Sequence, residues 1–159
     1  AGQARQSVVI HRERVVNASI SGDTTAGGRA RLPALLREHR PAIVVVELGG
    51  NDALRGGDLN ATRANLDAIV ADVQAARAQP VIVGMKVPPN YGPAYARTFD
   101  ALFTDVAKTR RAPVVPYVFE GFGDDLALFQ ADRIHPTAAA QTRILDNVWP
   151  VLLPLLSRR

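Results

Sequence analysis

The segment Asp-Arg-Ile-His-Pro at residues 132–136 carries residue types that can move a proton. Asp132 precedes His135 by three residues, and in a tight turn at this spacing its carboxylate can accept the Nδ1–H of the imidazole. That contact fixes the tautomer and leaves Nε2 free to act as a general base. Taken alone, the same segment could be a capped turn that carries a surface histidine.

Two further segments could stabilise negative charge on an oxygen atom. Ser-Gly-Asp-Thr at 21–24 and Gly-Gly-Asn-Asp at 49–52 each follow an apolar run. The N–H of Gly22 has no side chain in its way, and the Asn51 carboxamide can donate a second hydrogen bond to the same oxygen. Donors of this kind typically contribute about 3–4 kcal/mol each to a transition state. The plainer alternatives are a helix cap at 22–23 and a tight turn at 49–52. Together the three segments predict acyl transfer without supplying a nucleophile.

The elements that must position these residues alternate between strand and helix patterns. Strand-like runs occupy 14–20, 42–48, 80–85 and 112–116, and helical spacing occupies 29–39, 94–109 and a segment capped by Asn60. A last helix is predicted from about Thr137, with Ile144, Leu145 and Val148 buried, and Pro150 kinks or ends it. This order predicts one three-layer α/β/α domain over residues 1–159 with a parallel sheet. Ligands bind beyond the carboxyl ends of such strands, where Gly22 and Asn51 lie.

Composition excludes several other classes of protein. Hydrophobic residues make up 47% and charged residues 21% of the 159 residues, which is typical of a globular domain. No apolar run is long enough to span a bilayer, and no cysteine is present for disulfides or thiolate chemistry. The net charge of +4 comes mostly from scattered arginines without interleaved aromatic residues, so we expect no nucleic-acid partner. We expect a monomer.

Longer blocks around these residues resemble the SGNH (GDSL) hydrolases, in particular their bacterial thioesterase, lysophospholipase and arylesterase branch. The blocks lie at 15–24, 30–36, 46–56, 89–95 and 132–136, so the resemblance runs from Arg14 to the C-terminus, whereas 1–13 are atypical. It implies a flavodoxin-like sheet whose first strand is missing or replaced. It also implies Gly22 and Asn51 as oxyanion donors, His135 as general base and Asp132 as its orienting partner.

The same resemblance implies a substrate class and a location. The substrates are carboxylic esters and acyl thioesters, including acyl-CoA, aryl esters and lysophospholipids, which are small-molecule partners hydrolysed through a serine acyl-enzyme. The loop that borders the acyl groove corresponds to Val87, Pro88, Pro89, Asn90 and Tyr91. No cofactor or metal is implied, and the expected location is periplasmic or secreted.

The nucleophile is the point at which this chain departs from the family pattern. The family serine lies in a Gly-Asp-Ser-Leu block after the first strand, and these 159 residues contain no such block; family spacing would place it before Ala1. One interpretation is a chain without its first strand, and another is a non-catalytic acyl- or lipid-binding member in which residues 6–10 replace that strand. In a third interpretation Ser7, Ser19 or Ser21 is the nucleophile, with Ser21 favoured. In a fourth, Thr24 is the nucleophile. We expect weak or undetectable hydrolysis, since sites without a nucleophile retain about 10³–10⁴-fold over water.

Overall fold

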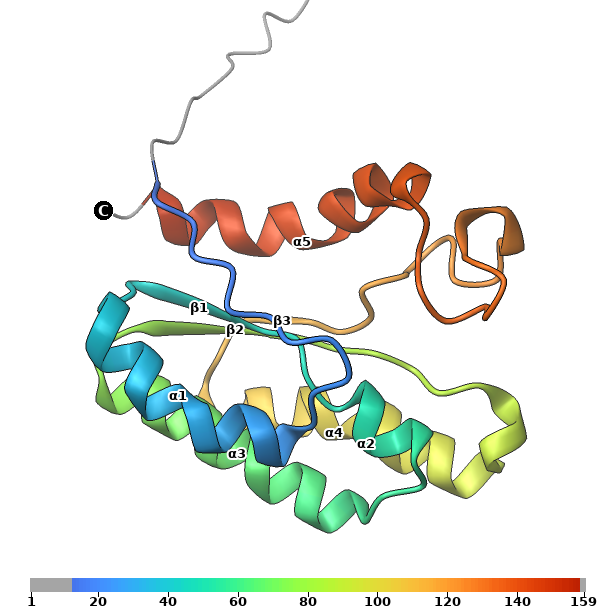
Figure 1. Cartoon of the computed structure of the whole chain (residues 1–159), viewed down its shortest axis with the longest axis horizontal. Helices are drawn as coiled ribbons and strands as arrows, with labels where there is room; N and C mark the ends of the chain where they lie inside the picture. Colours follow the sequence, from blue (N-terminus) through green and yellow to red (C-terminus); the bar gives the residue numbers. More distant parts are fainter. Residues whose placement is uncertain (1–12, 158–159) are drawn as a thin grey trace, which may run out of the picture.

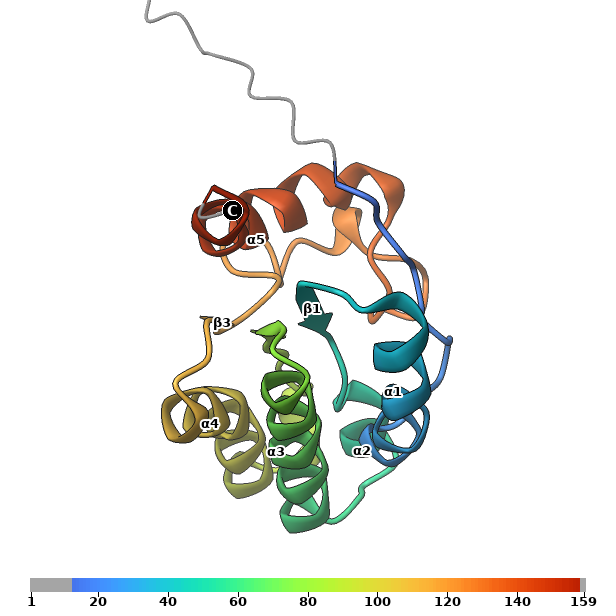
Figure 2. The same ribbon diagram turned by 90° about the vertical axis from the view of Figure 1, so that its left-hand side faces the viewer.

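A parallel sheet of three strands organises residues 13–157, which are the residues that the computed structural model describes. The strands are β1 (Ile43–Val46), β2 (Gln79–Val83) and β3 (Val114–Val115), in the order β1-β2-β3. Helices α1 (Thr25–His39), α3 (Leu59–Ala75) and α4 (Pro93–Arg110) cover one face, and α5 (Gln141–Leu156) covers the other (Figures 1 and 2). The predicted three-layer α/β/α fold is confirmed.

Short helical elements lie in the connections. They are α2 (Gly50–Leu54) and the 3₁₀ turns at Pro89–Tyr91, Leu126–Leu128 and Ala138–Ala140. No helix within residues 13–157 is both long enough and apolar enough to cross a membrane.

The main core lies between the sheet and the helices α3 and α4. Both helices bury a stripe at the spacing of helical turns, which on α3 comprises Leu66, Ile69, Val70 and Val73 and on α4 comprises Phe99, Leu102, Phe103 and Val106. The predicted cap of α3 is wrong by two residues: Asp58 is the N-cap, and its carboxylate accepts the N–H of Asn60 at 2.9 Å. A carboxylate ahead of the first turn is the better acceptor because it also opposes the positive end of the helix dipole.

The strand predicted at 14–20 is not formed. The segment runs without regular structure from beside α5 to the start of α1 (Figures 1 and 2), and the side chains of Val15 and Ile20 are 86% and 58% exposed. β-branched residues favour a strand only where a neighbouring strand supplies hydrogen bonds and a surface to pack on. Within residues 13–157 no strand pairs with this segment.

β1 has one open edge in the described part of the chain. It pairs with β2 alone, in a register that sets Val45 beside Val81 on the same face of the sheet. Val81 is fully buried, whereas Val45 is 49% exposed. The reason is the position of α5, which packs mainly against β2 and β3.

Helix α5 is consequently only half covered. Leu145, which the sequence predicts to be buried, is 55% exposed, and no residue of α5 is fully buried. The helix continues through Pro150 and Pro154 to Leu156, so neither proline ends it. The apolar face of α5 is therefore wider than the surface of β2 and β3 that it packs against.

The two register partners give a direct test of this uneven cover. We expect Val81→Ala to lower the free energy of unfolding by about 2 kcal/mol, because two fully buried methyl groups are removed. Val45→Ala is the matched control and should cost less than about 1 kcal/mol, since half of that side chain is already in water. Urea unfolding measures both values. Equal losses would show that Val45 is covered in solution.

Candidate active site

The Asp132 carboxylate organises the turn that carries His135. Its Oδ2 lies 2.7 Å from His135 Nδ1, and its Oδ1 accepts the backbone N–H groups of Ile134 at 2.9 Å and His135 at 3.0 Å. These hydrogen bonds, chiefly the backbone and imidazole bonds from His135, lower the pKa of Asp132 to about 2. An ionised carboxylate only accepts, so the proton of a neutral His135 lies on Nδ1, and Nε2 carries a free lone pair.

The low pKa of Asp132 also determines the pH below which its carboxylate no longer stabilises this turn. A carboxyl group with a pKa below its ordinary value of 3.8 stabilises the folded state above that pH. This contribution of Asp132 to stability is lost as the pH falls through about 2. At neutral pH Asp132 is therefore ionised and accepts its hydrogen bonds from the turn.

Backbone hydrogen bonds close the loop around this pair. The N–H of Gln130 donates to the carbonyl of His135 at 2.7 Å, and the N–H of Thr137 donates to Leu128 at 2.8 Å. Below the loop lies a small aromatic cluster in which Phe119 contacts Phe129 edge to face, with ring centroids 5.1 Å apart, and Phe122 is buried. The loop is thus held by its own core, separate from the core under α3 and α4.

Gly22 occupies a turn that requires a residue with positive φ. The N–H of Asp23 donates to the carbonyl of Ile20 at 3.2 Å, and Gly22 has φ of 79°, as in a type II turn. Arg55 fixes the peptide from the other side, since its guanidinium donates to the Gly22 carbonyl at 3.0 Å. The N–H of Gly22 donates no hydrogen bond within residues 13–157 and is available to a ligand.

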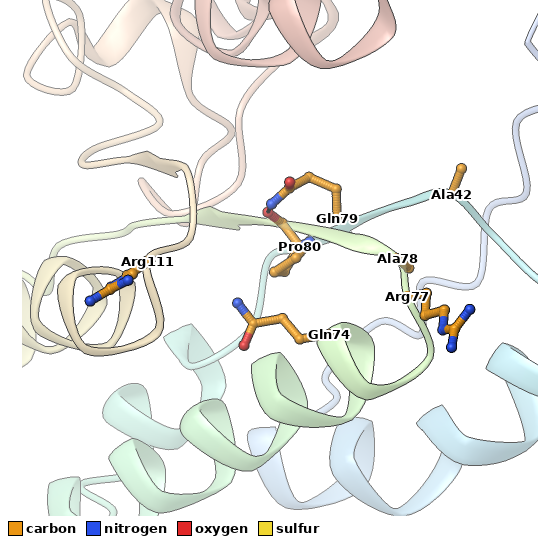
Figure 3. A pocket seen from close by; sticks show the side chains of 7 residues that line it. All are labelled: Ala42, Gln74, Arg77, Ala78, Gln79, Pro80 and Arg111. Carbon is orange, nitrogen blue, oxygen red and sulfur yellow. Dashed lines mark hydrogen bonds between the residues drawn. The ribbon is translucent and has the colours of Figure 1, made fainter. Parts of the chain in front are cut away.

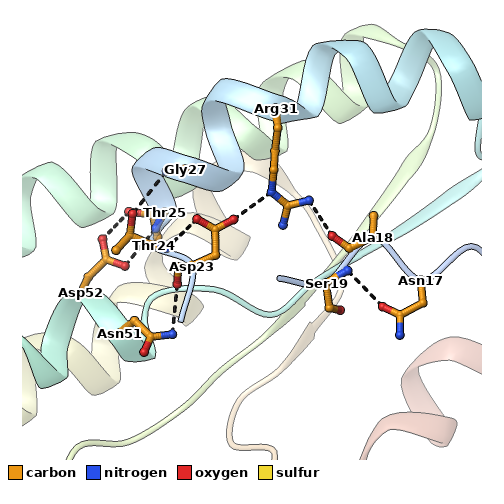
Figure 4. Close-up of polar contacts among 10 residues, drawn as sticks. All are labelled: Asn17, Ala18, Ser19, Asp23, Thr24, Thr25, Gly27, Arg31, Asn51 and Asp52. Carbon is orange, nitrogen blue, oxygen red and sulfur yellow. Dashed lines mark hydrogen bonds and ion pairs between the residues drawn. The ribbon is translucent and has the colours of Figure 1, made fainter. Parts of the chain in front are cut away.

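Asn51 lies next to this turn. Its Nδ2 donates to the carbonyl of Asp23 at 3.0 Å, which uses one of the two amide hydrogens and leaves the other free (Figure 4). Gly49 precedes α2 and lets its backbone pass close to the ring of Phe103. It has φ of 116°, and a Cβ there would lie 3.3 Å from that ring. The two predicted oxyanion donors are therefore brought together.

A half-buried carboxylate, that of Asp52, joins α2, which carries Asn51, to the first turn of α1, which follows the Gly22 turn (Figure 4). Asp52 accepts the N–H of Thr25 at 2.9 Å and its hydroxyl at 2.5 Å, and Thr62 contributes a longer contact at 3.4 Å. Thr25 is fully buried. Asp52 thereby ties the first turn of α1 to α2, and with them Gly22 to Asn51.

Arg31 holds the 18–23 segment against α1. Its guanidinium pairs with Asp23 at 2.8 Å and donates to the carbonyl of Ala18 at 2.5 Å (Figure 4). Sequence reasoning missed Asp52, Thr25 and Arg31, because their contacts join residues 8–27 positions apart. The one available signal was the acidic residue directly after Asn51.

The candidate nucleophiles do not join the pair of Asp132 and His135. Within residues 13–157 no hydroxyl group forms a hydrogen bond with His135. The Thr24 hydroxyl caps α1 by accepting the N–H of Gly27 at 3.3 Å, and Ser21 is exposed in the turn before Gly22. Ser7 and the strand suggested at residues 6–10 lie outside the described residues.

The loop at 87–91 is fastened beside α2. The Tyr91 hydroxyl donates to the carbonyl of Leu54 at 2.8 Å, and Tyr95, whose ring stacks on Tyr91, donates to Gly57 at 2.9 Å. Val87 is buried, whereas Pro88, Pro89 and Asn90 are exposed. The two tyrosines therefore fix one wall next to the helix that carries Asn51.

A shallow hollow lies at the opposite edge of the sheet, at the amino ends of the strands. Figure 3 shows its lining residues, Ala42, Gln74, Arg77, Ala78, Gln79, Pro80 and Arg111. The guanidinium groups of Arg77 and Arg111 point away from each other, so they do not converge on a common ligand. By contrast, the loop around His135 and the turn after Ile20 both lie toward the carboxyl ends (Figure 1). No group of three or more His, Asp or Glu side chains that could hold a metal ion is found in the described residues.

Comparisons with known proteins show what this chain is similar to. A family model for GDSL-like lipases/acylhydrolases matches residues 2–143. Esterase TesA of Pseudomonas aeruginosa is 52% identical over 143 residues, which are 90% of this chain and 71% of that protein. Thioesterase 1/protease 1/lysophospholipase L1 of Escherichia coli K12 is 45% identical over 143 residues, 90% of this chain and 69% of that protein. A crystal structure of TesA superposes with a TM-score of 0.86 at 51% identity, covering 89% of this chain and 79% of that one.

The tautomer of His135 tests the role of Asp132. We expect Asp132→Asn to move the imidazole proton from Nδ1 to Nε2, because the amide presents N–H donors where the carboxylate only accepts. The ¹⁵N chemical shifts of the ring nitrogens report the change directly. His39, which lies 3.8 Å from Glu38 and far along the chain, is the internal control and should not respond. An unchanged His135 tautomer would contradict the assignment.

The stability of the Asp52 junction is tested against a second capping aspartate. We expect Asp52→Ala to lower the free energy of unfolding by about 2–4 kcal/mol, because the buried hydroxyl and N–H of Thr25 lose a charged acceptor. Asp58→Ala removes an exposed N-cap and should cost only about 1 kcal/mol. Urea unfolding compares the two, and similar losses would mean that Asp52 is an ordinary cap.

Proposed function

The chain belongs to the GDSL-like lipase/acylhydrolase family, and we propose on this basis that its site hydrolyses carboxylic esters or acyl thioesters through a serine acyl-enzyme. The observation that carries the proposal is the 2.7 Å contact between Asp132 Oδ2 and His135 Nδ1, at the edge of the sheet where the free N–H of Gly22 and the Asn51 amide lie. The names of two relatives, esterase TesA and thioesterase 1, support an ester hydrolase.

In the proposed reaction each of these residues has one role. A serine hydroxyl attacks the acyl carbon while His135 Nε2 takes its proton, and the imidazolium then gives that proton to the leaving alcohol or thiol. Asp132 holds the imidazole in the required tautomer and stabilises its charged form. The N–H of Gly22 and the second amide hydrogen of Asn51 donate to the oxyanion. Water then releases the acyl group in the reverse sequence of proton transfers.

We place the nucleophile on a Gly-Asp-Ser-Leu strand, which the 159 residues do not contain. The open edge of β1 supports this, because a parallel strand added there would end at the same edge as Gly22 and Asn51. The capping role of the Thr24 hydroxyl argues against Thr24 as the nucleophile. For the chain as it stands, we therefore propose weak or undetectable hydrolysis.

The remaining features of the function are proposals of the same kind. The loop at 87–91, fixed by Tyr91 and Tyr95, borders the acyl chain of an acyl-CoA, aryl ester or lysophospholipid. The protein acts as a single domain and a monomer, without a cofactor or a nucleic-acid partner. Its proposed location is periplasmic or secreted.

Adding the missing block tests the proposal. We compare the chain with a variant extended at its N-terminus by the Gly-Asp-Ser-Leu strand and following helix of a family esterase. We expect the extended variant alone to react with a fluorophosphonate probe and to hydrolyse p-nitrophenyl butyrate. Replacing the serine of the block by alanine should abolish both, and in the extended variant Asn51→Ala, which removes a side-chain oxyanion donor, should lower kcat by about 10²–10³.

Two other results would point elsewhere. Labelling of the unextended chain would mean that one of its own hydroxyl groups attacks, and peptide mapping would then locate it. A folded extended variant that binds fatty acid tightly without turnover would favour the second candidate, a non-catalytic acyl- or lipid-binding protein. The observation that favours this second candidate is that no hydroxyl group within residues 13–157 forms a hydrogen bond with His135.

A further inference from the structure

Four residues other than glycine have a left-handed backbone in residues 13–157, and all four are arginines. They are Arg40, Arg77, Arg111 and Arg133, with φ of 43°, 60°, 52° and 60°. A residue with a Cβ is strained in this region, whereas glycine is not. Each such arginine therefore needs a reason for being there.

Helix ends explain three of them. Arg40 and Arg111 are the C-caps of α1 and α4, and Arg77 follows Ala76, the C-cap of α3. A left-handed residue closes the last turn of a helix, and a cation there faces the negative end of the helix dipole. All three precede strands, at the edge of the sheet away from the candidate site.

Arg133 has no such explanation. It lies between Asp132 and His135 in the turn of the proposed general base, where no helix ends. Its own N–H donates to the carbonyl of Gln130 at 2.8 Å, while the next two N–H groups are held by Asp132. These bonds impose the left-handed backbone, for which glycine would be the relaxed choice. The backbone of the turn does not require a guanidinium.

The charge of Arg133 is also unneutralised. The side chain is exposed, and within the described residues its guanidinium forms no ion pair or hydrogen bond. The nearest carboxylate along the chain, Asp132, is engaged by His135 and two N–H groups. A second exposed arginine, Arg55, lies at the Gly22 turn with a hydrogen bond to the Gly22 carbonyl and no ion pair. One cation thus adjoins the base and another adjoins an oxyanion donor.

We propose that Arg133 is a specificity-determining residue that favours acyl substrates whose leaving group carries a phosphate, an inference that rests on the proposed function. A strained residue kept beside a site is a signal of a role there, and a guanidinium matches phosphate oxygens with two parallel donors. The leaving group receives its proton from His135, two residues along the chain from Arg133, so it departs on the side of the site that carries this exposed cation. Acyl-CoA and lysophospholipid share this chemistry.

A pair of ligands with the same acyl thioester separates charge from acyl binding. Decanoyl-CoA carries phosphates, and decanoyl-pantetheine lacks them. We measure the Kd of both for the 159-residue chain by titration calorimetry, at low salt and in 0.5 M NaCl. We expect Arg133→Gln, which removes the charge and keeps the strain, to weaken decanoyl-CoA about three- to fivefold and decanoyl-pantetheine not at all. The difference should vanish at high salt.

Two further variants control for the backbone. Arg133→Gly removes both charge and strain, so it should lose the same affinity for decanoyl-CoA while raising the urea midpoint of unfolding. Arg77→Gln changes an arginine of the same backbone class at the opposite edge and should leave both Kd values unchanged. Lysophosphatidylglycerol and monodecanoylglycerol form a second pair, and a loss confined to one of the two phosphate ligands identifies its source.

The outcomes distinguish this inference from the proposed function. Unchanged affinity for both decanoyl-CoA and lysophosphatidylglycerol in both Arg133 variants, with decanoyl-pantetheine still bound, would overturn the inference without contradicting the proposed acyl site. Equal weakening of both thioesters would also overturn it, because Arg133 would then shape the site rather than read charge. Failure of both the parent chain and the extended variant to bind either thioester would contradict the proposed function, and this inference with it.

Discussion

The Asp52 carboxylate is the constraint on which one half of the site depends. It links the first turn of α1 to α2, and so determines how the Gly22 turn meets the Asn51 amide. Thr25, which it holds, is fully buried and Asp52 is half-buried, so the charged acceptor is partly shielded from water, which strengthens the interaction. Arg31 and Arg55 add bonds from the exposed side. The donors are positioned before any substrate arrives, which is the condition for electrostatic stabilisation without reorganisation.

The other half of the site is stabilised independently. The turn of Asp132 and His135 depends on Phe119, Phe122 and Phe129, a cluster separate from the main core. Its carboxylate satisfies two backbone N–H groups and the imidazole without any contact from the 18–23 segment. The Asp132–His135 pair is therefore complete in a structure whose sheet has an open edge.

The sequence predicted those features that depend on local spacing. The stripes of α3 and α4, the alternation of strands and helices and the Asp132–His135 contact all follow from residues close to each other in the sequence. It could not predict Asp52 holding Thr25 or Tyr91 holding Leu54, because these contacts arise only when distant segments meet. The burial of Leu145 and the strand at 14–20 were predicted from local pattern, and both are wrong for one reason: each assumes a neighbour that residues 13–157 do not provide.

The absence of a neighbouring strand at β1 within residues 13–157 concerns both stability and catalysis. Val45 is half exposed on β1, whose other edge is unpaired within residues 13–157, Ile20 is half exposed before α1, and Leu145 is half exposed on α5. A strand seated at that edge would cover apolar surface worth about 25 cal/mol per Å² and satisfy the open backbone groups of β1. If its carboxyl end also bore the serine of the proposed function, the same contacts would order the strand and aim the hydroxyl at the edge where Gly22 and Asn51 lie. The site would then be able to react only when the sheet is complete. Gly22, Asn51, His135 and Asp132 are already held in place without that strand, and only the nucleophile depends on it.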